Sequence, residues 1–400
     1  MDLSHQLALF FLAVLVFAAV SRRVTNRWFT APMVFVSVGL VLGSGGLGLL
    51  VFEPEGEFIT LLTEGTLLLL LFSDASQIQL KQLTHHWTVP GRLLGIGMPL
   101  TVGLGALVGW LLFPEWTPVE ALLVAAVLAP TDAALGQAVV SNPAVPAPIR
   151  EALTVESGLN DGITLPLVLV LLALAMSQVD DGATWVWFWA QQVVLGPLAG
   201  AVVGAVAGTL LEVGSRRRWA ESSALPAGSI ATALLCYVGA EAIGGNGFMA
   251  AFVGGMAFGR FAPTIGHNTH EFLESEGQLL LWMVFTLLGC VFAAPALQSA
   301  SPAQWVYALL SLTVVRMLPV ALSLIGTGFR WPTVAFLGWF GPRGLASLLF
   351  GLLLVEGELE GGESFFNVVL LTVLLSVMLH GVTASVSAVR YGAWASRSQK

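Results

Sequence analysis

Long apolar stretches recur along the whole chain and constrain its fold more than any other feature. A helix of about 20 apolar residues crosses the ~30 Å hydrocarbon core of a bilayer, and most of these stretches approach that length. Only 10% of the 400 residues are charged, against about a quarter in soluble domains. We therefore predict an all-α polytopic membrane protein with about thirteen transmembrane helices. The stretches cover residues 7–20, 30–51, 57–76, 92–113, 118–140, 149–176, 184–212, 222–242, 246–262, 273–297, 303–328, 332–356 and 364–390.

The basic residues indicate which connections between the stretches face the cytoplasm. All but two of the 16 Lys and Arg residues follow an odd-numbered stretch, whereas the opposite connections carry acidic residues and no Lys or Arg. Connections rich in Lys and Arg stay on the cytoplasmic side of a membrane. We therefore expect a multi-pass protein of the cell (inner) membrane, with the N-terminus outside and the C-terminus in the cytoplasm. This orientation requires an odd number of spans.

Five charged residues lie deep inside the apolar stretches. A charge at the centre of a bilayer costs about 2.5–3.5 kcal/mol on insertion scales, so such residues pair with one another or serve an ion pathway. Three of the five are acidic, so pairing among them leaves an excess negative charge that a cation would neutralise. The five are Asp132, Glu156, Asp161, Arg316 and Arg343.

Two of these charges follow residues that break helices. Pro130 precedes Asp132, and Pro342, which lies between two glycines, precedes Arg343. Non-helical backbone at membrane depth is tolerated only where it lines protein or water. Each break falls in the fifth span of a six-span half, which predicts two inverted repeats with crossed broken helices in a single transmembrane domain. The halves and the helix that links them cover approximately residues 7–176, 222–390 and 184–212.

The sixth stretch is predicted to carry two polar faces on one helix, because residues four apart share a face. Ser157 and Asp161 then point one way. Glu156 and Asn160 point about 100° away. With Asp132, the first pair would supply the hard oxygen ligands that suit a group I or similar cation. The second pair could accept hydrogen bonds from an arginine.

Six segments combine these polar residues and breaks into recognisable motifs. They are "APTDAALGQAVVSNP", "REALTVESGLNDGITLPLVL", "LLLLLFSDASQIQLKQL", "GNGFMAAFVGGMAFG", "VVRMLPV" and "WFGPRGLASLLF". Together they resemble the monovalent cation:proton antiporters, specifically the sodium/proton exchangers of the electroneutral branch. The resemblance implies a 13-span fold with a mobile core domain and a dimerisation domain, and assembly as a homodimer. It also implies exchange of a cation for H⁺, with Na⁺ expected and Li⁺ or K⁺ compatible.

The resemblance also implies roles for individual residues. Asp161 and Asp132 would bind the cation, assisted by Ser157 and by the backbone around Thr131. Asn160 would replace the second aspartate found in electrogenic relatives, so that one proton exchanges for one monovalent cation.

The same resemblance separates the remaining buried charges from the cation. Glu156 would form a structural ion pair with Arg316, and Arg343 would support the second broken helix. His380, in the last stretch, is expected to serve packing rather than proton relay.

Two other functions stay open. A passive cation channel or a K⁺ efflux protein could line its pathway with the same acids. An intramembrane aspartyl protease could use Asp132 and Asp161 as a dyad, although their Thr-Asp and Asn-Asp-Gly contexts differ from those usual in such enzymes.

The expected partners are membrane lipid and a second copy of the chain. We expect no enzymatic activity, no cofactor apart from the transported ions, no soluble regulatory domain, no nucleotide-binding domain and no nucleic acid partner. The chain has no P-loop motif, so coupling to ATP within this chain is not expected.

Overall fold

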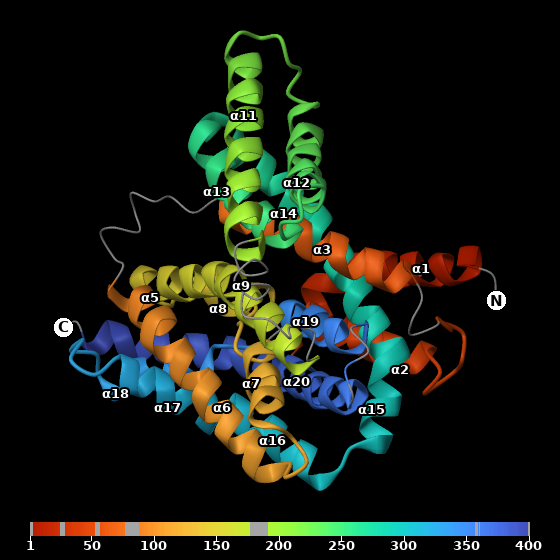
Figure 1. Cartoon of the computed structure of the whole chain (residues 1–400), viewed down its shortest axis with the longest axis vertical. Coiled ribbons are helices and arrows are strands. Elements are labelled where there is room, and N and C mark those ends of the chain that lie inside the picture. The colour runs from red at the N-terminus through yellow and green to blue at the C-terminus, as the bar shows by residue number, and fades with distance from the viewer. Residues whose placement is uncertain are drawn as a thin grey trace. The chain divides into compact units, whose positions relative to one another are not determined.

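The computed structural model describes residues 3–24, 29–52, 57–76, 88–176, 191–356, 359 and 361–398. Within these residues all regular elements are helices (Figure 1), which confirms the predicted all-α class. Seven of the described helices are long and apolar enough to cross a membrane, and shorter apolar helices accompany them. The number of thirteen spans stays a prediction.

The chain divides into two compact units. Unit 1 comprises Met1–Thr63, Thr88–Ser157 and Leu281–Lys400, and unit 2 comprises Glu64–Trp87 and Gly158–Leu280. These units differ from the two expected repeats, whose boundaries stay a prediction. Three helices belong partly to each unit: α3 (Glu57–Ser76), α9 (Ala147–Ala175) and α14 (Pro263–Leu287).

Unit 1 contains the longest helix, α20, and most of the short helices. Its own elements, with two π-helical turns named η, are α1 (Leu3–Val24), α2 (Ala31–Leu42), α5 (Thr88–Arg92), η1 (Leu93–Gly97), α6 (Met98–Leu112), α7 (Pro118–Val127), α8 (Ala133–Val140), η3 (Leu288–Ala293), α15 (Ala294–Ser299), α16 (Pro302–Leu312), α17 (Val314–Ser323), α18 (Trp331–Trp339), α19 (Leu345–Glu356) and α20 (Gly362–Ser398). The elements that belong to unit 2 alone are η2 (Gln191–Leu195), α11 (Gly196–Arg216), α12 (Leu225–Glu241) and α13 (Gly247–Phe261).

Two expected spans are interrupted near the middle, as predicted from their proline and glycine residues. The first break, residues 128–132, separates α7 from α8, and the second break, residues 340–344, separates α18 from α19. Pro130 and Pro342 lie inside these breaks, where the missing proline N–H costs no helical hydrogen bond.

A third interruption was not predicted. The stretch 303–328 was expected to be continuous, but Thr313 separates α16 from α17 with φ −108° and ψ −93°. The Thr313 hydroxyl donates to the Leu309 carbonyl at 2.7 Å. Threonine side chains that bond to the preceding turn in this way bend helices. Arg316 therefore lies at the start of a short, separate helix.

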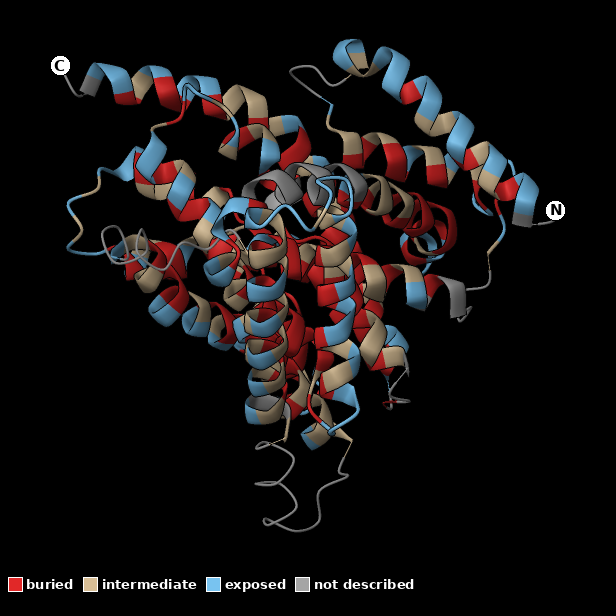
Figure 2. Cartoon of the chain, turned by 90° about the horizontal axis from the view of Figure 1, so that it is seen from above, coloured by how far each residue is buried: buried red, intermediate tan, exposed pale blue. Residues whose placement is uncertain are grey.

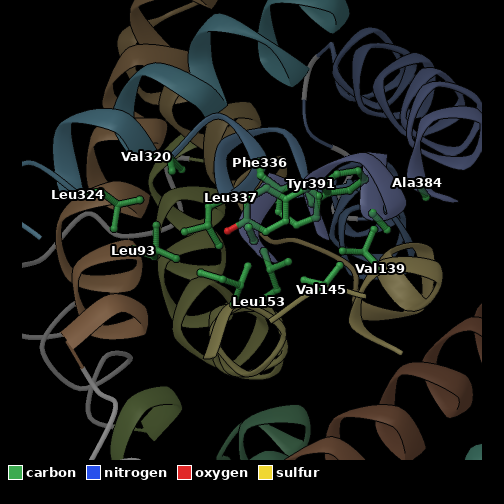
Figure 3. Close-up of a cluster of buried hydrophobic side chains, with 14 residues drawn as sticks. Leu93, Val139, Val145, Leu153, Val320, Leu324, Phe336, Leu337, Ala384 and Tyr391 are labelled. Carbon is green, nitrogen blue, oxygen red and sulfur yellow. The ribbon is translucent and has the colours of Figure 1, made fainter. Parts of the chain in front are cut away.

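A buried apolar cluster in unit 1 joins α8, which follows the first break, to α18, which precedes the second break (Figure 3). Val139 of α8 and Leu153 of α9 pack with Leu337 of α18 and with Tyr391 of α20. The Tyr391 ring stacks on Phe336 with ring centroids 4.1 Å apart. Within a bilayer such packing holds helices together by close van der Waals contact, so the cluster fixes the half-helices to their neighbours.

Glycines along one face of α11 allow α11 and α13 to approach closely in unit 2. The helices α11, α12 and α13 lie side by side (Figure 1). A Cβ on Gly200 or Gly204 would collide with the carbonyl oxygen of Ala250 or Gly254. Close packing of this kind is typical of helices with a small residue at every fourth position.

Apolar side chains also lie on the outside of the units. Along α1, which begins beside the N label in Figure 2, Phe11, Leu12, Leu15 and Val16 are all exposed. Exposed apolar helix faces of this kind are those that face lipid in a membrane protein.

Candidate cation-binding site

The two helix breaks of unit 1 are hydrogen-bonded to each other through Asp132. Its backbone N–H donates to the carbonyl of Pro342 at 2.8 Å. Its carboxylate accepts from Leu345 N–H at 2.8 Å through Oδ2. The second oxygen, Oδ1, accepts from Leu135 N–H at 3.2 Å. Leu345 opens α19 and Leu135 lies in the first turn of α8, so one carboxylate caps the N-termini of both half-helices.

This position suits a negative charge. The first N–H groups of a helix have no intrahelical partner, and its N-terminus carries a partial positive charge. The Asp132 carboxylate compensates two such ends at membrane depth. A Cβ on Gly344 would collide with the Asp132 carboxylate, so the approach of α19 to this carboxylate requires glycine at that position.

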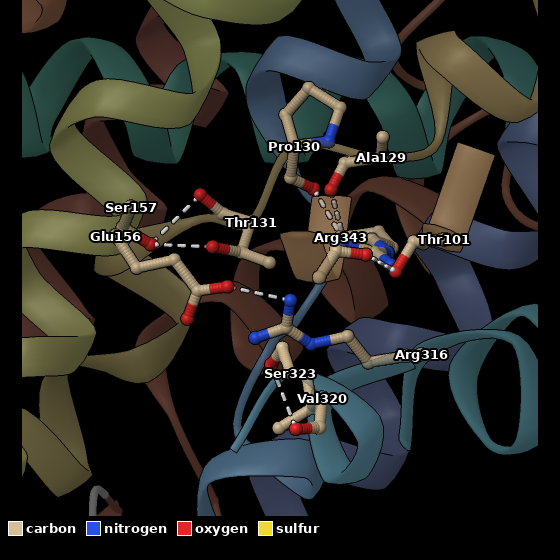
Figure 4. Close-up of polar contacts among 11 residues, drawn as sticks. Thr101, Ala129, Pro130, Thr131, Glu156, Ser157, Arg316, Val320, Ser323 and Arg343 are labelled. Carbon is tan, nitrogen blue, oxygen red and sulfur yellow. Dashed lines mark hydrogen bonds and ion pairs between the residues drawn. The ribbon is translucent and has the colours of Figure 1, made fainter. Parts of the chain in front are cut away.

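Arg343 bonds in the opposite direction, from the second break to the first. Its side chain is fully buried. Nη1 donates to the carbonyls of Ala129 at 2.6 Å and Pro130 at 3.0 Å (Figure 4). These carbonyls follow the C-terminus of α7, where the partial charge is negative and a cation is favoured. The guanidinium of Arg343 thus links the second break, where the residue lies, to the first break, and its support of the second broken helix stays a prediction.

Glu156 and Arg316 form a buried ion pair between α9 and α17. Glu156 Oε1 lies 2.6 Å from Arg316 Nη1, and each side chain is 3% exposed (Figure 4). A Cβ on Gly341 would collide with the Arg316 guanidinium. The structure thus brings together the two residues that the resemblance pairs, and the second break leaves room for this arginine.

The first break is also bonded to α9. Ser157 Oγ donates to the Thr131 carbonyl at 2.9 Å and lies 3.0 Å from Thr131 Oγ1 (Figure 4). Both residues are buried. Hydroxyl and carbonyl oxygens of unit 1 therefore gather beside Asp132, and these are ligand types that alkali cations accept.

Asn160 and Asp161 follow one helical turn later on α9, within unit 2. Asn160 is buried and Asp161 is partly buried. The participation of both residues in one cation site with Asp132 stays a prediction. Among the residues that the structure describes, no three His, Cys, Asp or Glu side chains gather as a metal site would require.

Two residues at the second break were not recognised as functional from the sequence. Ser376 Oγ accepts from Arg343 N–H at 2.7 Å, and His380 Nε2 lies 2.9 Å from the Trp339 carbonyl. A polar pair four residues apart on the last apolar stretch was the available signal, since such a pair shares one helix face.

Comparison with known proteins agrees with these features. The family model described as "Sodium/hydrogen exchanger, transmembrane" matches residues 9–389. The K(+)/H(+) antiporter NhaP of Alkalimonas amylolytica is 26% identical over 361 residues, covering 88% of this chain and 61% of that protein. The Na(+)/H(+) antiporter 2 of Zygosaccharomyces rouxii is 28% identical over 372 residues, covering 86% and 45%. The chain thus spans less than two thirds of the length of these relatives.

The fold has a solved counterpart. The sodium proton antiporter MjNhaP1 from Methanocaldococcus jannaschii superposes with a TM-score of 0.79 at 18% identity, over 98% of this chain and 100% of that chain. The shared fold and the family match over nearly all residues lead to one conclusion. The chain belongs to the sodium/hydrogen exchanger family of multi-pass membrane transporters.

Proposed function

We propose that the chain is a secondary active antiporter that exchanges a monovalent cation for H⁺ by alternating access. The observation that carries this proposal is the reciprocal bonding of the two breaks, in which Asp132 caps α8 and α19 while Arg343 bonds the carbonyls after α7. Crossed half-helices with compensated ends are a device for holding ions at the bilayer midplane. Relatives named as Na⁺/H⁺ and K⁺/H⁺ antiporters support the same class.

In this proposal Asp161 carries the charge that is exchanged. A proton or a cation neutralises the same carboxylate, so the two compete, and a neutralised site crosses the hydrocarbon at lower cost than a charged one. Thr131, Asp132 and Ser157 supply further oxygens to the cation. Na⁺ is the expected cation, and K⁺ and Li⁺ are the candidates to compare with it.

The other buried charges favour a stoichiometry of one proton for one cation. Glu156 is compensated by Arg316, and Asp132 already accepts two backbone N–H groups. Asn160 is neutral. One exchanging carboxylate then moves one positive charge in each direction, which makes the cycle electroneutral.

The remaining assignments belong to the same proposal. The N-terminus faces outside and the C-terminus faces the cytoplasm of the cell membrane, as the basic residues indicate. The working form is a homodimer in lipid. The cycle includes no enzymatic step, no cofactor and no nucleotide.

Proton flux in proteoliposomes tests the proposal. Vesicles with an internal pH-sensitive dye and an imposed pH gradient receive Na⁺, K⁺ or Li⁺ outside, over a series of pH values. Exchange predicts a cation-dependent change of internal pH with wild-type protein and none with Asp161→Asn. Cation uptake without proton movement would instead identify a channel.

A potassium–valinomycin potential across vesicles exchanging Na⁺ tests the stoichiometry. Electroneutral exchange predicts the same rate at either sign of the potential. A rate that scales with voltage would contradict one-to-one coupling.

A further inference from the structure

Side chains of α20 hold both ends of the second break. Ser376 Oγ accepts from the Arg343 backbone N–H at 2.7 Å, at the end of the break. His380 Nε2 lies 2.9 Å from the carbonyl of Trp339, the last residue of α18. The Trp339 indole N–H also donates to Thr383 Oγ1 at 2.9 Å. The break is therefore bonded to one continuous helix on both sides.

The His380 ring lies against three oxygens. Nε2 lies 2.9 Å from the Trp339 carbonyl, and Nδ1 lies 3.0 Å from the Ser376 carbonyl and 3.1 Å from Ser376 Oγ. A carbonyl oxygen only accepts and a neutral ring carries one proton, so a neutral His380 donates to one of the two carbonyls. With the proton on Nε2 the ring donates to Trp339, and Nδ1 can accept from the Ser376 hydroxyl, which itself accepts from Arg343 N–H. The Nε2–H tautomer is therefore the neutral form that bonds the second break.

The same segment of backbone contacts Asp132. The Pro342 carbonyl and the Leu345 N–H, which bond to Asp132, lie within six residues of Trp339 in the chain. Residues 340–344 lie outside any helix, although Phe340 N–H still bonds the Phe336 carbonyl and the Gly344 carbonyl still accepts from Leu348 N–H. The anchors from α20 therefore act together with the two helix ends in positioning the backbone groups that bond to Asp132.

We propose that Ser376 and His380 are positioning residues for cation exchange. They hold the second break at the geometry in which its backbone bonds to Asp132. His380 acts through its hydrogen bonds in the neutral Nε2–H form and does not relay the transported proton. This role rests on the cation–proton exchange proposed above. Its test therefore needs one measurement of transport and one measurement of the backbone of the second break.

Four single variants separate positioning from packing. His380→Leu removes the hydrogen bonds of the ring, Ser376→Ala removes the acceptor of Arg343 N–H, and His380→Gln keeps a donor for the Trp339 carbonyl. The matched control is Thr372→Val, since the buried Thr372 hydroxyl bonds only the Val368 carbonyl of the same helix at 2.7 Å.

The transport measurement is the apparent KM for Na⁺ and its pH profile in proteoliposomes. One lost hydrogen bond corresponds to a change of about three- to tenfold in an equilibrium constant. We expect the apparent KM to rise by that factor in His380→Leu and Ser376→Ala, to recover in His380→Gln and to be unchanged in Thr372→Val. We expect the midpoint of the pH profile of transport to stay at the wild-type value in all four variants. Combining Ser376→Ala with His380→Leu adds little, because both act on one network.

The measurement of the break is hydrogen–deuterium exchange of the backbone amides of residues 340–345. We expect faster exchange in His380→Leu and Ser376→Ala than in wild type or Thr372→Val. The comparison of amide exchange rates remains decisive even if wild-type vesicles show no cation–proton transport. That outcome would refute the proposed function and not the positioning of the second break. Amide exchange and KM in His380→Leu equal to those of Thr372→Val would overturn the positioning role. The positioning role would also be overturned if His380→Gln and His380→Leu shift the midpoint of the pH profile of transport by the same amount while KM stays constant. That result would indicate a proton relay.

Discussion

Removal of one partner of the Glu156–Arg316 pair should strongly destabilise the helices of unit 1. The two charges are 2.6 Å apart and each side chain is only 3% exposed, so solvent cannot take the place of a lost partner. Removing one member of such a pair typically costs about 3–5 kcal/mol, because the other charge is left buried and uncompensated. Both Glu156→Ala and Arg316→Ala should show this loss.

The corresponding change in melting temperature is large. A loss of 1 kcal/mol lowers the melting temperature by roughly 2–4 °C in proteins of 150–250 residues and by less in longer chains. We therefore expect each variant to melt roughly 5–10 °C below wild type. Melting in detergent is followed by the loss of the monodisperse peak in size-exclusion chromatography after heating.

A double variant and a surface variant complete the test. Glu156→Leu with Arg316→Met removes both charges, and it should recover most of the lost stability because no charge is left uncompensated. Glu151→Ala removes an exposed carboxylate from the same helix, α9, and should melt like wild type. The assigned partnership would be refuted if the single variants melt like Glu151→Ala, or if the double variant is as unstable as the sum of the two.

Three further outcomes are expected. Asp161→Asn should fold with the wild-type melting temperature yet lose cation-driven proton flux, whereas wild-type flux in this variant would remove its assigned role. Gly344→Ala should lose both stability and transport, because the added methyl collides with the Asp132 carboxylate; Gly103→Ala, where a Cβ meets no atom within 4 Å, should leave both unchanged. In wild type, the apparent KM for Na⁺ should rise as pH falls, because protons occupy more of the shared carboxylate, and a KM independent of pH would exclude competition at one site.

Much of the fold followed from local patterns in the sequence. Apolar length predicts membrane-spanning helices because an unpaired backbone group in lipid is costly. Proline and glycine predict the two breaks because they remove a helical donor or favour non-helical backbone. These signals need no knowledge of which helices are neighbours.

The partners of the buried charges depended on the tertiary structure. Asp132 and Leu345 are 213 residues apart in the chain, and only the crossing of the breaks brings that carboxylate to the N-terminus of α19. Arg343 lies in the second break, and the sequence does not show that its fully buried guanidinium bonds the first break. The polar spacing of Ser376 and His380 was visible, but their partners were not. A charge or hydrogen-bond donor has no sequence period of its own, so its partner is decided by which backbone ends the packed helices bring within reach.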